Sequence, residues 1–176
     1  HAMLSHLLKN DALYQAVIFT ATKRGADKLA ETLTAKGHSS AALHGDMNQG
    51  QRKRTIDRMR RGEHRLLVAT DVAARGLDID HLPFVVNFEL PNSPEDYVHR
   101  IGRTGRAGAE GTAVSLVCGE ETEKLAEIEK TIRLRIPRET VPGFGPHGTE
   151  APLMEPPRKE RRRSAPKTCS RIVRRS

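Results

Sequence analysis

The sequence predicts an α/β fold in which helices cover both faces of a parallel β-sheet. Short aliphatic runs alternate along the chain with longer segments of mixed polar and apolar residues, which is typical of successive strand–helix units. The runs are apolar almost throughout, as expected of strands that are buried on both faces. With 176 residues, the chain is long enough to enclose a sizeable core.

The ends of the helices in the first two strand–helix units can be predicted from the sequence. A buried-strand run at residues 15–20 precedes a helical pattern over 23–36, and a second strand at 40–43 precedes a helix over 49–61. Each helical pattern is followed at once by a glycine, a residue that commonly ends helices. Both helices are therefore predicted to end where these glycines stand.

The rest of the domain contains three more predicted strands. Residues 65–70, 84–88 and 111–117 are aliphatic runs of strand length. A short helix is expected to begin near Pro94, because proline is favoured in the first turn of a helix. The last helix is predicted over 120–135.

The end of the chain differs sharply in composition. Proline, glycine and charge dominate, and no aromatic residue follows Phe144. Residues 151–176 contain nine Lys or Arg against two Glu, so most of the net charge of +8 lies there. This composition favours a flexible, low-complexity tail. The predicted division is a cloning remnant at 1–3, a globular domain at 4–140 and a basic tail at 141–176.

Cysteine spacing and hydropathy indicate the cellular compartment in which the protein is expected. Cys118 and Cys169 show neither disulfide nor metal-ligand spacing, so a reduced intracellular protein without a metal site is expected. Cys118 lies in an aliphatic run and is predicted to be a small buried side chain. No apolar run reaches the roughly 18 residues of a membrane span, and the N-terminus lacks the apolar stretch of a signal peptide. A cytoplasmic location without a membrane partner is therefore predicted.

The most informative segment is the string from His99 to Arg106, which holds three arginines at three-residue spacing and two glycines. Guanidinium groups at this density call for a concentrated negative charge, and their shape suits two-point contacts with phosphate oxygens. The glycines let the backbone approach a ligand closely. The alternative interpretation is a solvated basic loop.

The segment from Thr70 to Asp78 directly follows a predicted strand. A threonine at a strand end offers a hydroxyl and a backbone N–H to a phosphate, and Asp78 is placed to accept hydrogen bonds from a ribose hydroxyl. Alternatively, Asp71 and Asp78 only cap turns. Ligands of open parallel sheets bind at the carboxyl ends of the strands, where these residues are expected.

The same edge receives residues from the second strand. Residues 44–46 follow that strand, and Gln49 and Arg52 are three positions apart on the next predicted helix. This spacing places both side chains on one helix face, near backbone N–H groups that suit phosphate. Lys53 and Arg54 are interpreted instead as a solvated face.

Together these motifs resemble those of the second RecA-like domain of DEAD-box RNA helicases. The resemblance covers roughly residues 4–140 and implies a RecA-like parallel sheet sandwiched by helices. Residues 136–144 and the basic tail also look like the bacterial RhlE branch. The matching segments are 17–23 (motif IV), 49–52 (motif IVa), 70–78 (motif V) and 99–106 (motif VI).

The resemblance implies a role for each matching residue. Arg103 and Arg106 would be catalytic arginine fingers on the γ-phosphate of ATP, and Asp78 would contact the ATP ribose. His99 and Arg100 would couple this domain to the ATPase motifs of a partner domain. The RNA sugar-phosphate backbone would be held by Thr22, Gly45, Gln49, Arg52 and Thr70.

Two parts of such an enzyme are missing from the sequence, which has neither a GxxxxGK[ST] loop nor a DEAD tetrapeptide. The chain thus lacks a lysine for the β- and γ-phosphates and an acidic pair for Mg²⁺. The implied partners are RNA and an N-terminal RecA-like domain of the same protein, which would hold most of the ATP and Mg²⁺. The whole protein is expected to unwind RNA duplexes locally, and this chain alone to be ATPase-inactive.

Two other functions stay open from the sequence. One is an RNA tether that acts mainly through the basic tail, and the other is a DNA-translocating relative from the same superfamily. His99 at the first position of its motif favours the RNA branch, because DNA-acting relatives more often carry glutamine there. The tail itself is either an RNA contact or a solubilising extension.

Overall fold

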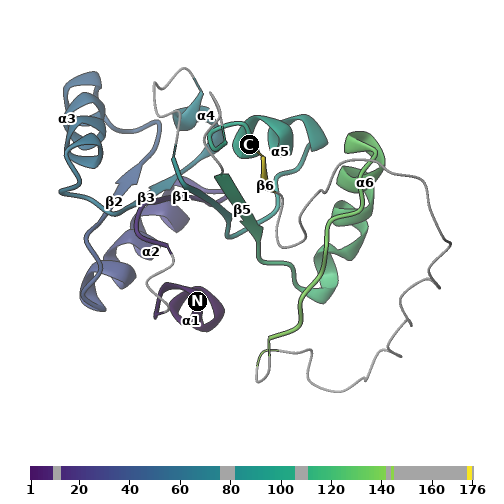
Figure 1. Cartoon of the computed structure of the whole chain (residues 1–176). Coiled ribbons are helices and arrows are strands. Elements are labelled where there is room, and N and C mark those ends of the chain that lie inside the picture. The colour runs from purple at the N-terminus through teal and green to yellow at the C-terminus, as the bar shows by residue number, and fades with distance from the viewer. Residues whose placement is uncertain (10–12, 76–81, 106–110, 142–143, 145–173, 176) are drawn as a thin grey trace, which may run out of the picture.

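A computed structural model describes residues 1–9, 13–75, 82–105, 111–141, 144 and 174–175, and it shows one central sheet between two helical layers (Figure 1). The strands are β1 (Ala16–Phe19), β2 (Ser40–Leu43), β3 (Leu66–Ala69), β4 (Phe84–Asn87), β5 (Gly111–Ser115) and β6 (Arg174–Arg175). The helices are α1 (Ala2–Lys9), α2 (Lys23–Ala35), α3 (Gln49–Arg60), α4 (Asp71–Ala74), α5 (Pro94–Ile101) and α6 (Thr122–Ile132). A 3₁₀ turn at Gly119–Glu121 leads into α6.

The sheet has the strand order β2-β3-β1-β4-β5-β6. The first five strands in this order are parallel, and β6 lies antiparallel beside β5. In the middle of the sheet, Val17 of β1 pairs with Leu67 of β3 on one side and Val85 of β4 on the other. Because the strands run in one direction, the segments that leave β1 to β4 meet at the same edge of the sheet.

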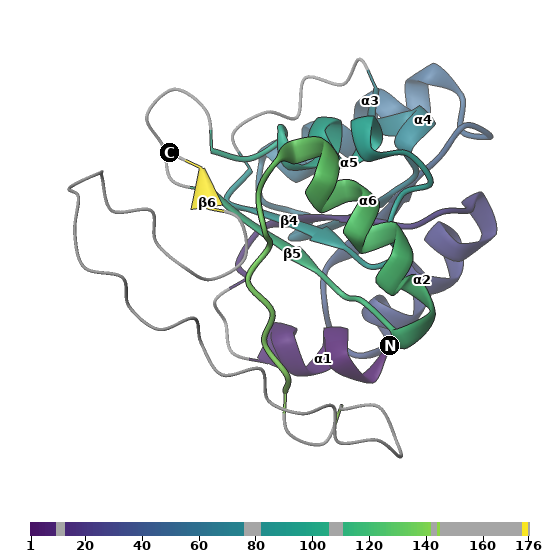
Figure 2. The same cartoon turned by 90° about the vertical axis from the view of Figure 1, so that its right-hand side faces the viewer.

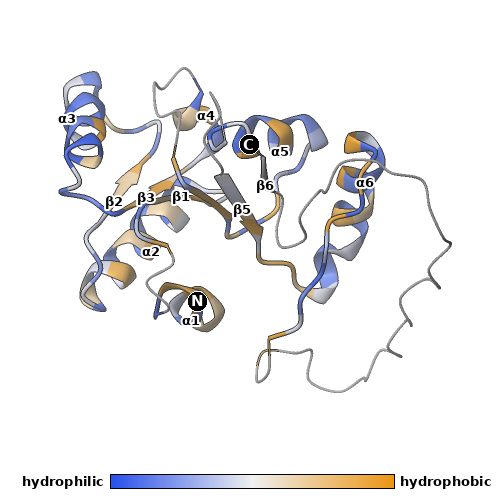
Figure 3. Cartoon of the chain, in the orientation of Figure 1, coloured by the Kyte–Doolittle hydropathy of each residue, from blue (hydrophilic) through white to orange (hydrophobic). Residues whose placement is uncertain are grey.

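Alternate residues of each strand supply two separate cores. Val17 and Phe19 face one core, which the helices α3 to α6 complete. Ala16 and Ile18 face the other core, which α1 and α2 complete. Figure 2 shows α5 and α6 on one side of the sheet and α1 and α2 on the opposite side. Hydrophobic colour follows the strands in Figure 3, whereas α3 is mostly hydrophilic.

The predicted α/β fold is confirmed, with strand ends that differ by one or two residues. The predicted helix 120–135 ends earlier, at Ile132, because Arg133 adopts a left-handed conformation with φ of 53°. The sequence reading missed α1, although Leu4 and Leu8 are one turn apart and both buried. It also missed the single-turn helix α4. Apart from Val141, Phe144 and β6, the predicted tail lies outside the described residues.

The expectation for Cys118 is wrong. β5 ends at Ser115, and Cys118 is exposed beyond the strand rather than buried in it. Its Sγ lies 3.2 Å from Oε2 of Glu121, and this hydrogen bond raises the pKa of the thiol. An apolar run in a sequence does not bury its last residue when the strand stops short of it.

Across the described ranges, no helix combines the length and the apolar composition that a bilayer crossing requires. Within the same ranges, no group of three or more His, Cys, Asp or Glu residues is placed to hold a metal ion.

Candidate functional site

The carboxyl edge of the sheet brings the predicted clusters together. The backbone N–H of Thr20, just after β1, donates to the carbonyl of Ala69 at 3.0 Å. That of Thr70, just after β3, donates to the carbonyl of Leu43 at 3.2 Å. The segments after β1, β2 and β3 are thereby tied side by side. This N–H of Thr70 is occupied within the sheet, so only its hydroxyl is left for a phosphate.

Arg100 lies inside the domain, with 2% of its surface exposed. Its Nε and Nη2 donate to the two carboxylate oxygens of Asp71 at 2.5 and 2.8 Å. Its Nη1 donates to Oδ1 of Asn87 at 3.1 Å and to the carbonyl of Glu89 at 2.7 Å. The guanidinium carbon also lies 4.9 Å from the ring centroid of Phe19. These contacts are all within the domain, so the predicted coupling of Arg100 to a partner domain would act through them.

A chain of hydrogen bonds continues from Arg100 across the sheet. Asn87, which is fully buried, donates from Nδ2 to the hydroxyl of Ser115 at 3.1 Å. That hydroxyl lies 3.4 Å from the hydroxyl of Tyr97. Burial raises the pKa of Tyr97. The buried polar groups of β4, β5 and α5 thus satisfy one another, which fixes the orientation of α5 on the sheet.

Asp96 provides a second connection between α4 and α5. The Arg75 guanidinium, just after α4, lies 2.5 Å from the Asp96 carboxylate on α5. Burial alone would raise the pKa of Asp96, but hydrogen bonds from Arg75 and Ser93 outweigh it and leave the pKa lowered. His99, one turn further along α5, lies 3.9 Å from the same carboxylate and is 65% exposed. The segment that follows β3 and the helix α5 are therefore joined at two points.

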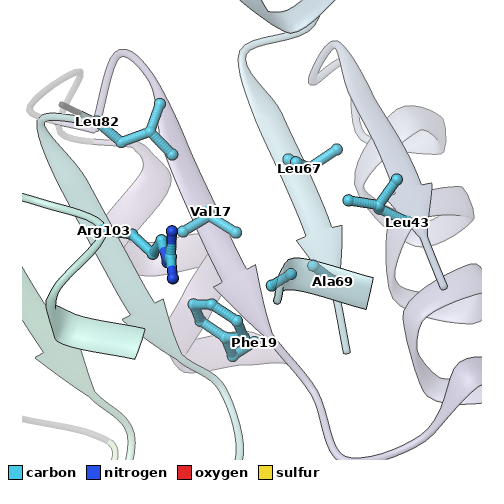
Figure 4. A pocket seen from close by; sticks show the side chains of 8 residues that line it. Val17, Phe19, Leu43, Leu67, Ala69, Leu82 and Arg103 are labelled. Carbon is cyan, nitrogen blue, oxygen red and sulfur yellow. The ribbon is translucent and has the colours of Figure 1, made fainter. Parts of the chain in front are cut away.

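Arg103 lines two small recesses on the α4–α5 side of the sheet. In the first, its side chain lies beside Val17 and Phe19 over the apolar face of the strands (Figure 4). The second is bordered by Arg75, His99 and Arg103 together with the carboxylates already described. Three arginines outnumber two carboxylates around this recess, so its net charge is positive and suits phosphate oxygens. The residues present therefore fit the phosphate end of a nucleotide.

Thr22 and Gly45 lie on exposed segments that an ion pair holds together. Thr22 begins α2, and its hydroxyl oxygen accepts a hydrogen bond from the N–H of Gly25 at 3.0 Å. The Lys23 ammonium pairs with the carboxylate of Asp46, next to Gly45. This hydrogen bond lowers the pKa of Asp46. Two of the predicted RNA contacts are thereby brought to the same surface.

Gln49 and Arg52 lie on the first turn of α3, and Gln49 is exposed. Arg52 donates from Nη2 to the carbonyl of Ala73 in α4 at 3.0 Å. Its Nε is buried and finds no hydrogen-bond partner among the described residues. A buried donor without a partner is costly, and an acceptor brought by a ligand would satisfy it once the atoms that cover it move aside. A phosphate oxygen has the matching chemistry.

Two of the predicted site residues, Asp78 and Arg106, lie outside the described residues. Conversely, the sequence reading missed Asn87 and Glu89 as partners of Arg100. The signal for Asn87 is a polar residue at the end of an otherwise apolar strand, where burial demands a polar partner. No local pattern marks Glu89, because its contacts come from distant segments.

Comparison with known proteins identifies relatives of the whole domain. The family described as helicase conserved C-terminal domain matches residues 1–108. The DEAD-box ATP-dependent RNA helicase CshA of Geobacillus kaustophilus is 45% identical over 136 residues, which cover 77% of this chain and 29% of that protein. The ATP-dependent RNA helicase eIF4A of Sclerotinia sclerotiorum is 44% identical over 127 residues, which cover 72% and 32%. The chain therefore spans less than a third of the length of these curated relatives.

Solved structures agree with the sequence relatives. The E. coli DEAD-box protein SrmB, in its complex with regulator of ribonuclease activity A, superposes with a TM-score of 0.79 at 38% identity. This match covers 84% of the present chain and 87% of the SrmB chain. S. cerevisiae Dbp5 bound to RNA and ADP BeF3 gives a TM-score of 0.67 at 39% identity and covers 73% and 35%.

Proposed function

The chain belongs to the helicase conserved C-terminal domain family, within the DEAD-box RNA helicases, and on this basis we propose that it forms half of an ATP-dependent RNA helicase. In this role it supplies arginine fingers to ATP and part of the binding site for the RNA backbone. The other half is an N-terminal RecA-like domain of the same protein. RNA and that domain are its partners.

One observation carries the proposal. The recess bordered by Arg75, His99 and Arg103 includes the segment that leaves β3, and Thr22 and Arg52 lie on the segments that follow β1 and β2 at the same edge of the sheet. A nucleotide phosphate and an RNA phosphate placed there would contact neighbouring segments of one rigid frame. A protein that only tethers RNA has no need of the first of these two sites.

Each side chain has a definite task in this mechanism. Arg103 and Arg106 neutralise negative charge that develops on the γ-phosphate during hydrolysis, a contribution of about 10³–10⁵-fold for an arginine finger. Asp78 accepts hydrogen bonds from the ribose, and exposed His99 faces the ATPase motifs of the other domain. When bound, ATP supplies the phosphoanhydride bond and Mg²⁺ neutralises its phosphate charge. Both are held mainly by the N-terminal domain.

On the RNA side, the site of this domain is completed only when the two domains close. Thr22, Gln49, Arg52, Thr70 and the backbone at Gly45 bind sugar-phosphate groups of one strand. Binding of both ligands favours the closed arrangement, because each adds contacts that the open arrangement lacks. The bound strand is bent, and pairing with its complement is lost locally. Reopening after hydrolysis releases the strand.

Further parts of the proposal rest on the sequence. The chain alone has no RNA-stimulated ATPase activity, because it lacks the phosphate-binding loop and the acidic pair. The protein is also proposed to belong to the RhlE-like branch, a proposal supported by residues 136–144 and the basic tail. The composition is that of a cytoplasmic protein.

An ATPase assay tests the proposed function. The two-domain protein and this chain alone are compared with single-stranded RNA, single-stranded DNA or no nucleic acid. RNA is expected to stimulate the two-domain protein, DNA is expected to have little effect, and the chain alone is expected to stay inactive. Robust RNA-dependent turnover by this chain alone would contradict the composite site, and equal stimulation by DNA would favour a DNA-acting relative.

A further inference from the structure

Glu89 joins two segments of the domain that carry different motifs, residues 17–23 and the helix α5. Its backbone N–H donates to the carbonyl of Phe19 in β1 at 3.3 Å. Its carbonyl accepts the Nη1 donor of Arg100 at 2.7 Å. Its carboxylate Oε2 accepts the backbone N–H of Ala21 at 2.5 Å. One residue thereby contacts Arg100 of the helix α5 and the loop that precedes α2.

We infer that Glu89 is a positioning residue that couples the RNA-contacting loop at Ala21–Thr22 to the arginine-finger segment that follows α5. This inference rests on the proposed function, because it assigns RNA to Thr22 and ATP to Arg103. Glu89 itself touches neither ligand. It acts through Ala21 on one side and through Arg100 on the other.

The Arg100 end of this connection is rigid. The guanidinium is almost fully buried and is held at two points by Asp71. Its ring contact with Phe19 adds a further restraint on its position. Displacement of α5 therefore moves the Glu89 carbonyl with it, since breaking a buried charge-assisted hydrogen bond is expensive.

The Ala21 end of the connection is more adaptable. The hydrogen bond from Ala21 lies at the surface, and Glu89 is only partly buried. The next residue, Thr22, caps α2 and is exposed. A carboxylate that holds the Ala21 N–H therefore fixes the direction in which the Thr22 segment enters the helix. Release of this hydrogen bond would remove the direct link from Glu89 to the loop, which would still be held by the Thr20–Ala69 hydrogen bond and by the Thr22 cap of α2.

The segment around Glu89 is clamped at its other end as well. The N–H of Phe88 donates to the carbonyl of Phe19 at 3.0 Å, and the N–H of Leu90 donates to Oε1 of Glu121 at 3.2 Å. Local slack in residues 88–90 therefore does not absorb a movement of α5. The side chain of Glu89 gives such a movement a direct path to Ala21, in addition to the backbone contacts with Phe19.

The experiment measures how strongly nucleotide and RNA binding depend on each other. In the two-domain protein, the affinity for a fluorescent single-stranded RNA is determined with and without a non-hydrolysable ATP analogue. The ratio of the two dissociation constants is the coupling factor, and typical allosteric coupling amounts to about 5- to 150-fold. Glu89→Ala is expected to reduce this factor about fivefold or more.

Three further variants separate coupling from general damage. Glu89→Gln keeps an oxygen acceptor for Ala21 and is expected to retain most of the coupling. Glu89→Met keeps the side-chain length without the acceptor, and it replaces the alanine variant if that one fails to fold. Glu31→Ala removes an exposed carboxylate from α2 and is expected to leave the factor unchanged.

The outcomes distinguish the inference from the proposed function. Loss of coupling in Glu89→Ala or Glu89→Met, with retention in the glutamine variant, supports the inference. If those two variants keep a coupling factor within about twofold of the wild type, the inference is overturned while the proposed function stands. The same conclusion follows if they bind RNA more weakly by the same amount with and without the analogue. Absence of coupling in the wild type would instead overturn the proposed function and the inference with it.

Discussion

Asp71 and Arg100 form a two-point ion pair that joins α4 to α5, with N–O distances of 2.5 and 2.8 Å. Asp71 follows a strand end and Arg100 belongs to the arginine string, so the pair connects two segments that carry separate motifs. The carboxylate does not merely cap a turn. It balances a charge that α5 buries in the domain.

Replacement of Asp71 by alanine is expected to destabilise the domain strongly. The Arg100 charge would stay buried without its main partner, and breaking a buried pair in this way costs about 3–5 kcal/mol. Urea denaturation of this chain measures the change in the free energy of unfolding. Glu63→Ala is the control, because the ion pairs of Glu63 with Arg58 and Arg61 lie on the surface, and its midpoint should not move. An equal loss in both variants would contradict the structural role of Asp71.

Arg103→Ala in the two-domain protein is expected to lower RNA-stimulated ATP turnover by about 10³-fold or more, because an arginine finger stabilises only the transition state. RNA affinity at low salt should stay within about twofold. Arg103→Lys keeps the charge without the planar fork and should restore little turnover. Turnover is measured by phosphate release and affinity by fluorescence anisotropy. A fall in affinity as large as the fall in turnover would show that Arg103 is not a finger.

Arg52→Gln is expected to weaken single-stranded RNA binding and to reduce the salt dependence of that binding. Removal of one phosphate-binding charge should make the slope of log affinity against log salt shallower by about 0.7. Lys53→Gln is a matched control, since it removes one positive charge from the next residue of α3, which is exposed. Titrations at several salt concentrations measure both slopes. Equal effects would mean that the whole basic face of α3 attracts RNA and that Arg52 makes no particular contact.

Truncation after Gly148 separates the basic tail from the sheet edge as a source of RNA affinity. If the sheet edge dominates, the truncated chain should keep its affinity within a few fold at moderate salt. The tail contains no aromatic residue after Phe144, so any contribution from the truncated part should be independent of base sequence. Binding of two RNAs of different sequence to both chains provides the measurement. Collapse of affinity on truncation would favour the RNA-tether hypothesis.

His64 should make the stability of this chain depend on pH. Burial, and then the nearby Arg58 charge, lower its pKa below the ordinary value of 6.5. Below about pH 6.5, His64 becomes protonated in the unfolded chain while it stays neutral in the folded chain. The free energy of unfolding should therefore fall as the pH decreases. Comparison of wild type and His64→Gln by denaturation between pH 5 and 8 isolates this contribution. A variant with the same pH dependence as the wild type would contradict it.

The parallel sheet and the positions of its elements were predictable because they depend on local pattern. Aliphatic runs such as 65–70 and the glycines after two helices mark strands and helix ends within a few residues. The same patterns placed Gln49 and Arg52 at one edge of the sheet, because the carboxyl ends of parallel strands lie together. What it did not reveal is α4, because a single turn of four residues is too short to show a helical period.

The internal role of Arg100 was not predicted, although part of its signal is present. In α5 the residues Tyr97, Arg100 and Ile101 share one face at helical spacing, and all three are buried. That spacing marks Arg100 as inward-facing once the helix is known to extend to Ile101. Its partners Asn87 and Glu89 come from another strand and the segment after it, however. No local rule states which distant polar groups a buried arginine will meet.

The central position of β1 has a consequence for how the chain folds. Its neighbours are β3 at 66–69 and β4 at 84–87. Both edges of the first strand therefore pair with segments that are synthesised much later. Closing such long loops lowers the chain entropy before strand pairing provides any compensating free energy. The middle of the sheet is therefore completed late, and a nascent chain leaves one edge of the apolar β1 unpaired until residue 87 has emerged.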